Sequence, residues 1–286
     1  MSASTRAKVK VMVIAHGHPD HEKGGGEIAA YNLHKQVATQ EGFDSVFFAR
    51  HGRRELVHGG TPNAGTGREK EIIAYAVMPD WFRFSQPDKA LVWRDFRQAL
   101  EACKPDIVHF HHYLHLGLEL IREVRNYNAD IRVVLTLHEY YAICHNQGQM
   151  VKTDRSLCYR SSPDACAQCF SQYSAQDFML RKLFIQSHLD NVDTFIAPSQ
   201  FLKNRYVEWG LHASRITVIE NLLEDTVENT DNTDREYQRA STTRVRFAFF
   251  GQINWFKGLD LLLDAIAMLP RTLRQQVQLD INGSGL

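Results

Sequence analysis

The chain has 286 residues, 44% of them hydrophobic and 23% charged, a composition typical of globular proteins with one large domain or two ordinary ones. Lysine plus arginine number 33, as do aspartate plus glutamate, so charge gives no argument for binding nucleic acid or an anionic membrane surface. There is no apolar run of about 18 residues, and the one at residues 11–15 is too short for a signal peptide, so the expected location is the cytoplasm.

Short β-rich runs alternate with helical segments over the first 223 residues. The predicted strands are residues 9–15, 45–49, 72–77, 107–110, 133–137, 194–197 and 216–219. The predicted helices are residues 27–38, 89–103, 116–127, 175–190 and 200–209. The strands are continuously apolar, as in a parallel sheet buried on both faces, and the alternation predicts a doubly wound, Rossmann-like α/β domain.

Three polar segments interrupt this alternation. Residues 50–70 form a glycine-rich loop, and residues 140–174 form a loop with four of the five cysteines. Residues 224–243 are acidic, lack apolar periodicity and are interpreted as an interdomain linker. After it, residues 244–286 contain a predicted strand (245–250), helix (259–269) and strand (277–281). So small a unit cannot enclose its own core, so we expect a second α/β domain inside which the chain is truncated.

The stretch "VMVIAHGHPDHEKGGGEIAAYNLHKQV", residues 11–37, supports two interpretations. A strand, three glycines and an amphipathic helix can direct free backbone N–H groups at a phosphate, although this is neither GxGxxG nor a P-loop and a plain turn is the alternative. The run "HGHPDHE" is similar to the AHPDDE motif of zinc-dependent amidohydrolases that deacetylate N-acetylglucosamine conjugates. That similarity predicts a metal at His18 and Asp20, with His21 replacing an aspartate of the motif. The acidic groups can instead favour the positive helix N-terminus.

Histidines gather where two further strands are predicted to end. The stretch "KPDIVHFHHYLHLG" carries four at or just beyond a strand end, namely His109, His111, His112 and His115. The stretch "TLHEYY" places His138 and Glu139 after the next strand. Ligands of open α/β sheets bind outside the carboxyl ends of strands, where a histidine can donate to a sugar hydroxyl or stabilise charge. We therefore expect these residues and the glycine loop to line one crevice.

Four cysteines, Cys144, Cys158, Cys166 and Cys169, follow the spacing C-x13-C-x7-C-x2-C. Four thiolates would satisfy a tetrahedral structural zinc ion and tie down a long loop that lacks a core. Reduced free thiols and a disulfide are the alternatives. Cys103, at the end of a predicted helix, is expected to be a small core residue.

In this order and combination, these stretches resemble the retaining glycosyltransferases of family four, which have the two-domain GT-B fold. The resemblance rests on "GGGEIAAYNLHKQV", "PDIVHFHH", "TLHEYY" and the cysteine-bearing insertion, and on "FIAPSQFLKNRYVEWGLHASRITVIENLLE" near the end of the first domain. The stretch "FAFFGQINWFKGLDLLLDAIAML" is similar to the start of the donor-binding domain. The resemblance implies an acceptor-side domain over residues 1–223 and a partial nucleotide-sugar-binding domain over residues 244–286.

The resemblance implies transfer of a hexosyl unit, with retention, from a UDP- or GDP-sugar to a glycan or lipid-linked acceptor. Surface polysaccharide or glycolipid synthesis at the inner face of a membrane is the implied setting, with peripheral membrane contact. By position, the resemblance places His111 beside the anomeric centre as the catalytic residue. It places Gly25, Gly26, Lys257, Gln252, Gly283 and Gly285 at the donor, and His18, His138 and Glu139 on the acceptor side. Lys257 would neutralise the diphosphate, so no cofactor is expected for catalysis.

Two departures from the family pattern affect these expectations. Many members have an arginine where this chain has Gln252, which cannot supply positive charge. The family's Glu-x7-Glu motif would fall after residue 286, so the chain as given is expected to bind donor weakly and to transfer little sugar. The zinc amidohydrolase and a non-catalytic sugar- or nucleotide-binding module stay open as alternatives.

Overall fold

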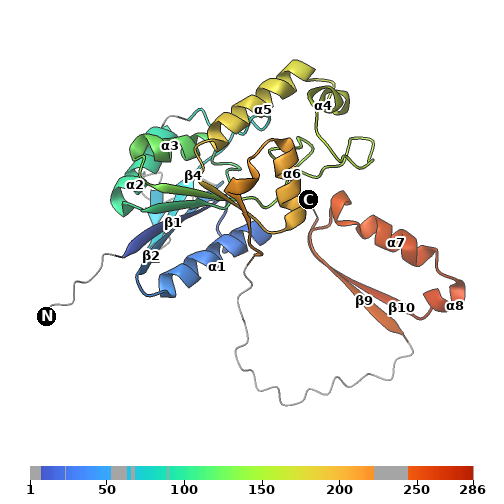
Figure 1. Ribbon diagram of the computed structural model, residues 1–286. Coiled ribbons are helices and arrows are strands. Elements are labelled where there is room, and N and C mark those ends of the chain that lie inside the picture. The colour runs from blue at the N-terminus through green and yellow to red at the C-terminus, as the bar shows by residue number, and fades with distance from the viewer. Residues whose placement is uncertain are drawn as a thin grey trace, which may run out of the picture. The chain divides into compact units, whose positions relative to one another are not determined.

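The computed structural model describes residues 8–22, 24–52, 63–65, 68–88, 90–221 and 244–285 (Figure 1). The chain divides into two compact units, Met1–Glu224 and Asp225–Leu286, which we describe separately. The predicted linker, residues 224–243, lies outside the described residues, as does much of the predicted glycine-rich loop. No helix in the described part of the chain is long and apolar enough to cross a membrane.

The first unit contains a single sheet with the order β3-β4-β2-β1-β5-β6-β7-β8. Its strands are β1 (Val9–Ala15), β2 (Phe43–His51), β3 (Asn63–Gly65), β4 (Glu71–Tyr75), β5 (Ile107–Phe110), β6 (Arg132–Thr136), β7 (Thr194–Ala197) and β8 (Ile216–Val218). All are parallel except β3, which pairs antiparallel with β4. The predicted parallel sheet is confirmed. The edge strand β3 was not predicted, because its sequence "NAG" contains no β-branched residue and no alternating pattern.

Helices cover both faces of this sheet (Figure 1). They are α1 (Gly25–Thr39), α2 (Arg97–Cys103), α3 (Glu119–Tyr127), α4 (Pro163–Cys169), α5 (Ala175–Leu189) and α6 (Gln200–Trp209). Alternation along β1 divides the core: Val11 and Val13 belong to the smaller cluster with α1, and Met12 and Ile14 to the larger cluster with α2, α3, α5 and α6. Burial on both faces is the reason that β1 is apolar throughout.

Three predicted helices differ from the structure at their starts. The helix predicted over 116–127 starts only at Glu119, because His115 and Gly117 have φ values of +62° and +92°, which a helix cannot contain. The one predicted over 89–103 begins as a π-helix, Ala90–Phe96, that continues into α2. The first begins two residues earlier than predicted, at Gly25, with Gly24 as its N-cap.

The direction in which strands are added reverses between β1 and β5. From β1 the chain moves outward through β2 and β4, whereas from β5 it moves the other way through β6, β7 and β8. Ile14 pairs with Phe110, and the backbone N–H of His111 donates to Ile14 O at 2.8 Å. The segments following β1 and β5 therefore leave the sheet side by side, at the position where open α/β sheets bind ligands.

The second unit has the predicted strand–helix–strand order. Strands β9 (Val245–Phe250) and β10 (Val277–Asn282) pair in parallel. Between them lie a 3-10 turn, η4 (Trp255–Lys257), and the helices α7 (Leu259–Ala267) and α8 (Arg271–Arg274). Gly258 follows η4 with φ +73°, a conformation for which glycine is suited, and it is the N-cap of α7.

Candidate functional site

A cluster of histidines lies at the carboxyl ends of β1, β5 and β6, and we call it the histidine cluster. Its members are His16, His109, His111, His112, His115 and His138. Ring centroids are 4.6 Å apart for His16 and His112, and 5.3 Å apart for His111 and His138, whose rings stack. The sheet thus brings together side chains that the sequence separates by up to 122 residues, at the switch point between β1 and β5.

His111 is buried at 5% exposure, and among the described residues one of its ring nitrogens has no partner. Its Nδ1 lies 3.1 Å from Nε2 of His138, so one of these two nitrogens donates to the other. Its Nε2 is buried and finds no hydrogen-bond partner among the described residues. An unpaired buried polar group costs about 1–3 kcal/mol, so a ligand that supplies the missing partner would be bound favourably here.

Burial keeps several members of the cluster uncharged near neutral pH. It lowers the pKa of His109 to about 3 and that of His138 to about 4, and neighbouring imidazoles add to both effects. Burial first, and then His109 and His138, lower the pKa of His111 well below its ordinary value. A neutral imidazole has one donor and one acceptor nitrogen, which matches a sugar hydroxyl better than it matches an anion.

His112 and Glu139 form a second pair in the cluster. The N–H of Leu114 donates to Nδ1 of His112 at 2.9 Å, so the proton of a neutral ring resides on Nε2, which donates to Glu139 Oε1 at 3.1 Å. The other carboxylate oxygen of Glu139 is buried without a partner among the described residues. Burial opposes ionisation of Glu139, but the electrostatic attraction and hydrogen bond of His112 outweigh it and lower the pKa of Glu139. Glu139 therefore presents a charged acceptor within the histidine cluster.

The glycine segment lies against the same cluster. Nε2 of His16 is 2.9 Å from Oε1 of Glu27, in the first turn of α1. A Cβ added at Gly26 would meet the rings of His16 and His138 at 3.8 Å, whereas one added at Gly25 would meet nothing within 4 Å. A Cβ added at Gly24 would lie 2.3 Å from Oε2 of Glu27, so the Glu27 side chain would have to move to admit it. The predicted convergence of the glycine loop with the two strand ends is therefore present, with Gly25 on its open side.

His18 does not join this convergence. It is buried at 1% exposure, and its ring packs edge-on against Tyr31 and Phe47. The N–H of Asp20 donates to its Nδ1 at 3.2 Å, so Nε2 donates to Glu71 Oε2 at 3.2 Å. These contacts fix the segment after β1 against β4, which is a structural role.

The predicted metal at His18 and Asp20 has no ligand set in the structure. Asp20 pairs with Arg68 at 2.8 Å, and His18 is used by Glu71. In the part of the chain that the structure describes, no three histidine, cysteine, aspartate or glutamate side chains are already arranged around a metal position. The geometry therefore favours the ligand cleft over the metal interpretation of the opening stretch.

Glu27 was not among the residues predicted to bind ligand, and His16 was predicted only as one of the histidines and acids in the run "HGHPDHE". His16 is the first residue after β1, as His111 is the first after β5, and that equivalence was a usable signal. Glu27 is an acidic residue in the first turn of a helix, which by itself indicates only an interaction with the helix dipole.

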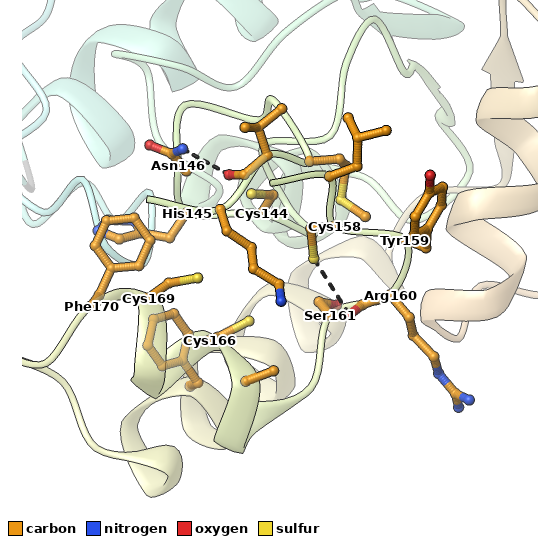
Figure 2. Close-up of a pocket in the computed structure, with 16 residues that line it drawn as sticks. Cys144, His145, Asn146, Cys158, Tyr159, Arg160, Ser161, Cys166, Cys169 and Phe170 are labelled. Carbon is orange, nitrogen blue, oxygen red and sulfur yellow. Dashed lines mark hydrogen bonds between the residues drawn. The ribbon is translucent and has the colours of Figure 1, made fainter. Parts of the chain in front are cut away.

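The four cysteines predicted to bind metal come together in the fold. Cys144, Cys158, Cys166 and Cys169 all line one cavity of about 260 Å³, and all are free thiols (Figure 2). Cys103 is half-buried and packs against the larger core cluster, in agreement with the prediction of a core residue.

In the second unit, the loops after β9 and β10 lie together. Gly251 N donates to Asn282 O at 3.1 Å, and Ile253 pairs with Gly285. A Cβ at Gly283 would lie 1.8 Å from Gly251 O, so only glycine allows this approach. Gln252 and the two predicted nucleotide-site glycines are thus neighbours. Lys257 is exposed at the end of η4.

Comparison with known families matches residues 23–225 to the model of Glycosyltransferase Family 4, which is more than two thirds of the chain. The chain belongs to glycosyltransferase family 4. The match spans the glycine segment, the histidine cluster except for His16, and the cysteine-containing loop, so these features belong to the family 4 region of the chain. A search among curated proteins gives no significant match.

Solved structures show that this family 4 chain has the GT-B fold. Anabaena Alr3699/HepE in complex with UDP and glucose has a TM-score of 0.54 at 13% identity, covering 97% of this chain and 62% of that one. An E. coli structure described as trehalose-6-phosphate bound with UDP-2-fluoro glucose has a TM-score of 0.55 at 11% identity, covering 97% and 65%. The chain thus spans about three fifths of the length of these structures.

Proposed function

We propose that the protein is a glycosyltransferase that moves a hexosyl unit from a nucleotide-sugar to an acceptor hydroxyl, with retention at the anomeric carbon. The observation that carries the proposal is the unpaired, buried Nε2 of His111 at the switch point of the sheet. A neutral imidazole there can complete its hydrogen bonding with a donor sugar hydroxyl. Support comes from family 4 membership and from HepE, which was solved with UDP-glucose.

The start of α1 suits the diphosphate of such a donor. The helix has 15 residues, so its first turn lies at the positive end of a full helix dipole. Gly25, whose Cβ position is open, lets the backbone approach a phosphate oxygen closely. For Lys257 in the second unit we propose a role in binding the donor diphosphate, as its position in "NWFKG" implies.

On the acceptor side we propose His138 and Glu139. The unpaired Oε2 of Glu139 is a charged acceptor for a hydroxyl of the incoming glycan. The acceptor class is a glycan or lipid-linked glycan of surface polysaccharide or glycolipid synthesis, and the donor base is uracil or guanine.

Donor binding tests this proposal on a protein that carries these 286 residues. Calorimetry with UDP-glucose and then other UDP- and GDP-sugars should find a binding donor. His111→Ala should weaken donor binding at least about tenfold and lower the rate of transfer about a hundredfold. The matched control is His188→Ala, which also deletes a buried imidazole with an unpaired Nε2, but from α5. Transfer undiminished in folded His111→Ala would refute the proposal, and donor binding without transfer would indicate a binding module.

Gly25→Ala tests the phosphate contact separately. Because the added methyl group meets nothing within 4 Å, stability should be unchanged within about 0.5 kcal/mol. Donor affinity should nevertheless fall about tenfold, and that of the free nucleoside diphosphate with it. Unchanged affinity for both would show that the start of α1 does not contact the donor phosphates.

A further inference from the structure

The middle of the cysteine-containing loop, residues 151–169, contains no buried residue. Helix α4 contains no buried residue, and Leu157 and Tyr159 are 62% and 69% exposed. Gln147, Met150 and Arg155 adopt left-handed conformations with φ of 51°, 52° and 70°, which cost energy for residues other than glycine. A cross-link would help a segment with these properties to hold one conformation.

Three separate parts of this loop deliver the thiols to one cavity. Cys144 ends the turn after Glu139, where its N–H donates to Tyr140 O at 2.8 Å. Cys158 follows the bridge between Val151 and Leu157, and its N–H donates to Met150 O at 2.9 Å. Cys166 and Cys169 are three residues apart on α4, so they share one side of the helix. In Figure 2 this pair faces Cys144 and Cys158 across the cavity.

We propose that Cys144, Cys158, Cys166 and Cys169 bind one structural zinc ion. Four thiolates form a closed tetrahedral set, which leaves no position for substrate and is typical of structural zinc. Among the described residues no three of these sulfurs surround a metal position as they stand, so the side chains lining the cavity of about 260 Å³ would have to turn until each sulfur lies about 2.3 Å from the ion. Binding would displace the thiol protons to solvent and would replace the weak contact of Cys158 Sγ with Arg160 O, now 3.5 Å.

His145 lines the same cavity, but its ring is packed among aromatic side chains. Its ring packs edge-on against Phe82, Phe170, Tyr173 and Phe178 at centroid distances of 4.8–6.3 Å. Coordination would require the ring to leave this aromatic packing. The ligand set is therefore four sulfurs and no nitrogen.

The zinc ion would extend an anchor that already holds the beginning of the loop. The Tyr206 hydroxyl donates to Glu139 O at 2.9 Å, and Arg181 donates to the carbonyl oxygens of Tyr141 and Ala142. Beyond Cys144 the loop is held by scattered contacts, among them the aromatic packing of His145 and a hydrogen bond from Arg205 to Tyr159 O at 2.6 Å. The ion would join α4 and the Cys158 turn to the segment that positions Glu139 in the histidine cluster.

Metal analysis of the purified 286-residue chain tests this inference independently of any transferase activity. We expect about one equivalent of zinc, replaceable by Co²⁺ with the thiolate-to-cobalt charge-transfer absorption of a tetrahedral site. Cys158→Ser and Cys166→Ser should each lose most of the metal, whereas Cys103→Ser, which removes the remaining cysteine, should retain it. Less than about a tenth of an equivalent, after anaerobic incubation with zinc, would overturn the proposal. A mass decrease showing a disulfide among the four would do the same.

Limited proteolysis provides a readout should a serine variant fail to fold. Chelation of the wild-type chain should make residues 144–170 sensitive to protease, and added zinc should restore protection. Tryptic resistance that is identical with and without chelator would contradict a zinc-dependent loop.

Discussion

Replacement of Arg181 by methionine should lower the free energy of unfolding by about 3 kcal/mol. The side chain is 3% exposed, and its guanidinium donates to Phe82 O at 2.6 Å, Tyr141 O at 2.7 Å and Ala142 O at 2.8 Å. A hydrogen bond to a charged group contributes about 1.5–3 kcal/mol, so a simple sum would exceed 4 kcal/mol. The expected loss is smaller than this sum because methionine avoids the cost of burying the charge, and because contributions within one network are not additive. The same burial lowers the pKa of Arg181.

Urea unfolding followed by circular dichroism measures this loss. Arg122→Met is the matched control: Arg122 is exposed on α3, and its removal should change stability by less than about 0.5 kcal/mol. Arg181→Lys should lose nearly as much as Arg181→Met, because one ammonium group cannot reproduce the planar fork that reaches three carbonyls. A loss below about 1 kcal/mol for Arg181→Met would show that these carbonyls are well solvated or paired without it, and the reasoning would fail.

Three further predictions concern stability. Since His109 and His138 have pKa values of about 3 and about 4 when folded and an ordinary value of 6.5, the unfolded chain binds more protons between those limits. The stability that depends on these two rings being neutral is therefore complete above pH 6.5 and is lost as pH falls towards 4. Urea midpoints should fall over this range, and they should fall by less in His109→Gln. Gly117→Ala should cost about 2–4 kcal/mol in urea unfolding, because its Cβ would lie 2.3 Å from Gln86 Cβ at φ +92°. Gly42→Ala, also at positive φ but with open space around it, should cost only about 1 kcal/mol, and equal losses would exclude the clash as the cause. Asp193→Asn should cost about 1–2 kcal/mol at pH 7, since its carboxylate accepts from Arg125 and Val133 N. Burial raises the pKa of Asp193, but these bonds outweigh it and lower the pKa. The difference in unfolding free energy between Asp193→Asn and wild type should therefore vanish as pH falls below 3.8.

The parallel sheet was predictable because burial on both faces leaves a plain mark on the sequence. In β1 every side chain from Val11 to Ala15 is buried, one set towards α1 and the other towards the opposite layer. The same requirement made β5, β6 and β7 recognisable. The edge strand β3 has no such requirement, because only β4 pairs with it, and its sequence therefore resembles a loop.

The candidate site was predictable in its location but not in its membership. Strand ends and the order of strands determine that the segments after β1 and β5 meet. Which loop side chain turns inward depends on the loop itself. The N–H groups of His21 and Glu22 both donate to His18 O, and this tight turn directs His18 to Glu71 and leaves His16 beside His112. No spacing rule distinguishes two histidines that are two residues apart in such a turn.

The histidine cluster can supply hydrogen bonds to the proposed donor but little positive charge. Burial keeps His109, His111 and His138 neutral at pH 7, so they supply hydrogen bonds and no positive charge. A diphosphate must then be balanced elsewhere, and the candidates are the start of α1 and Lys257. A charged histidine next to Glu139 would pair with it and withdraw the acceptor that a hydroxyl needs. Under the proposed function, neutral imidazoles contact the sugar while separate positive groups hold the phosphates, and donor affinity should therefore be independent of pH between about 6.5 and 8 with respect to these three residues.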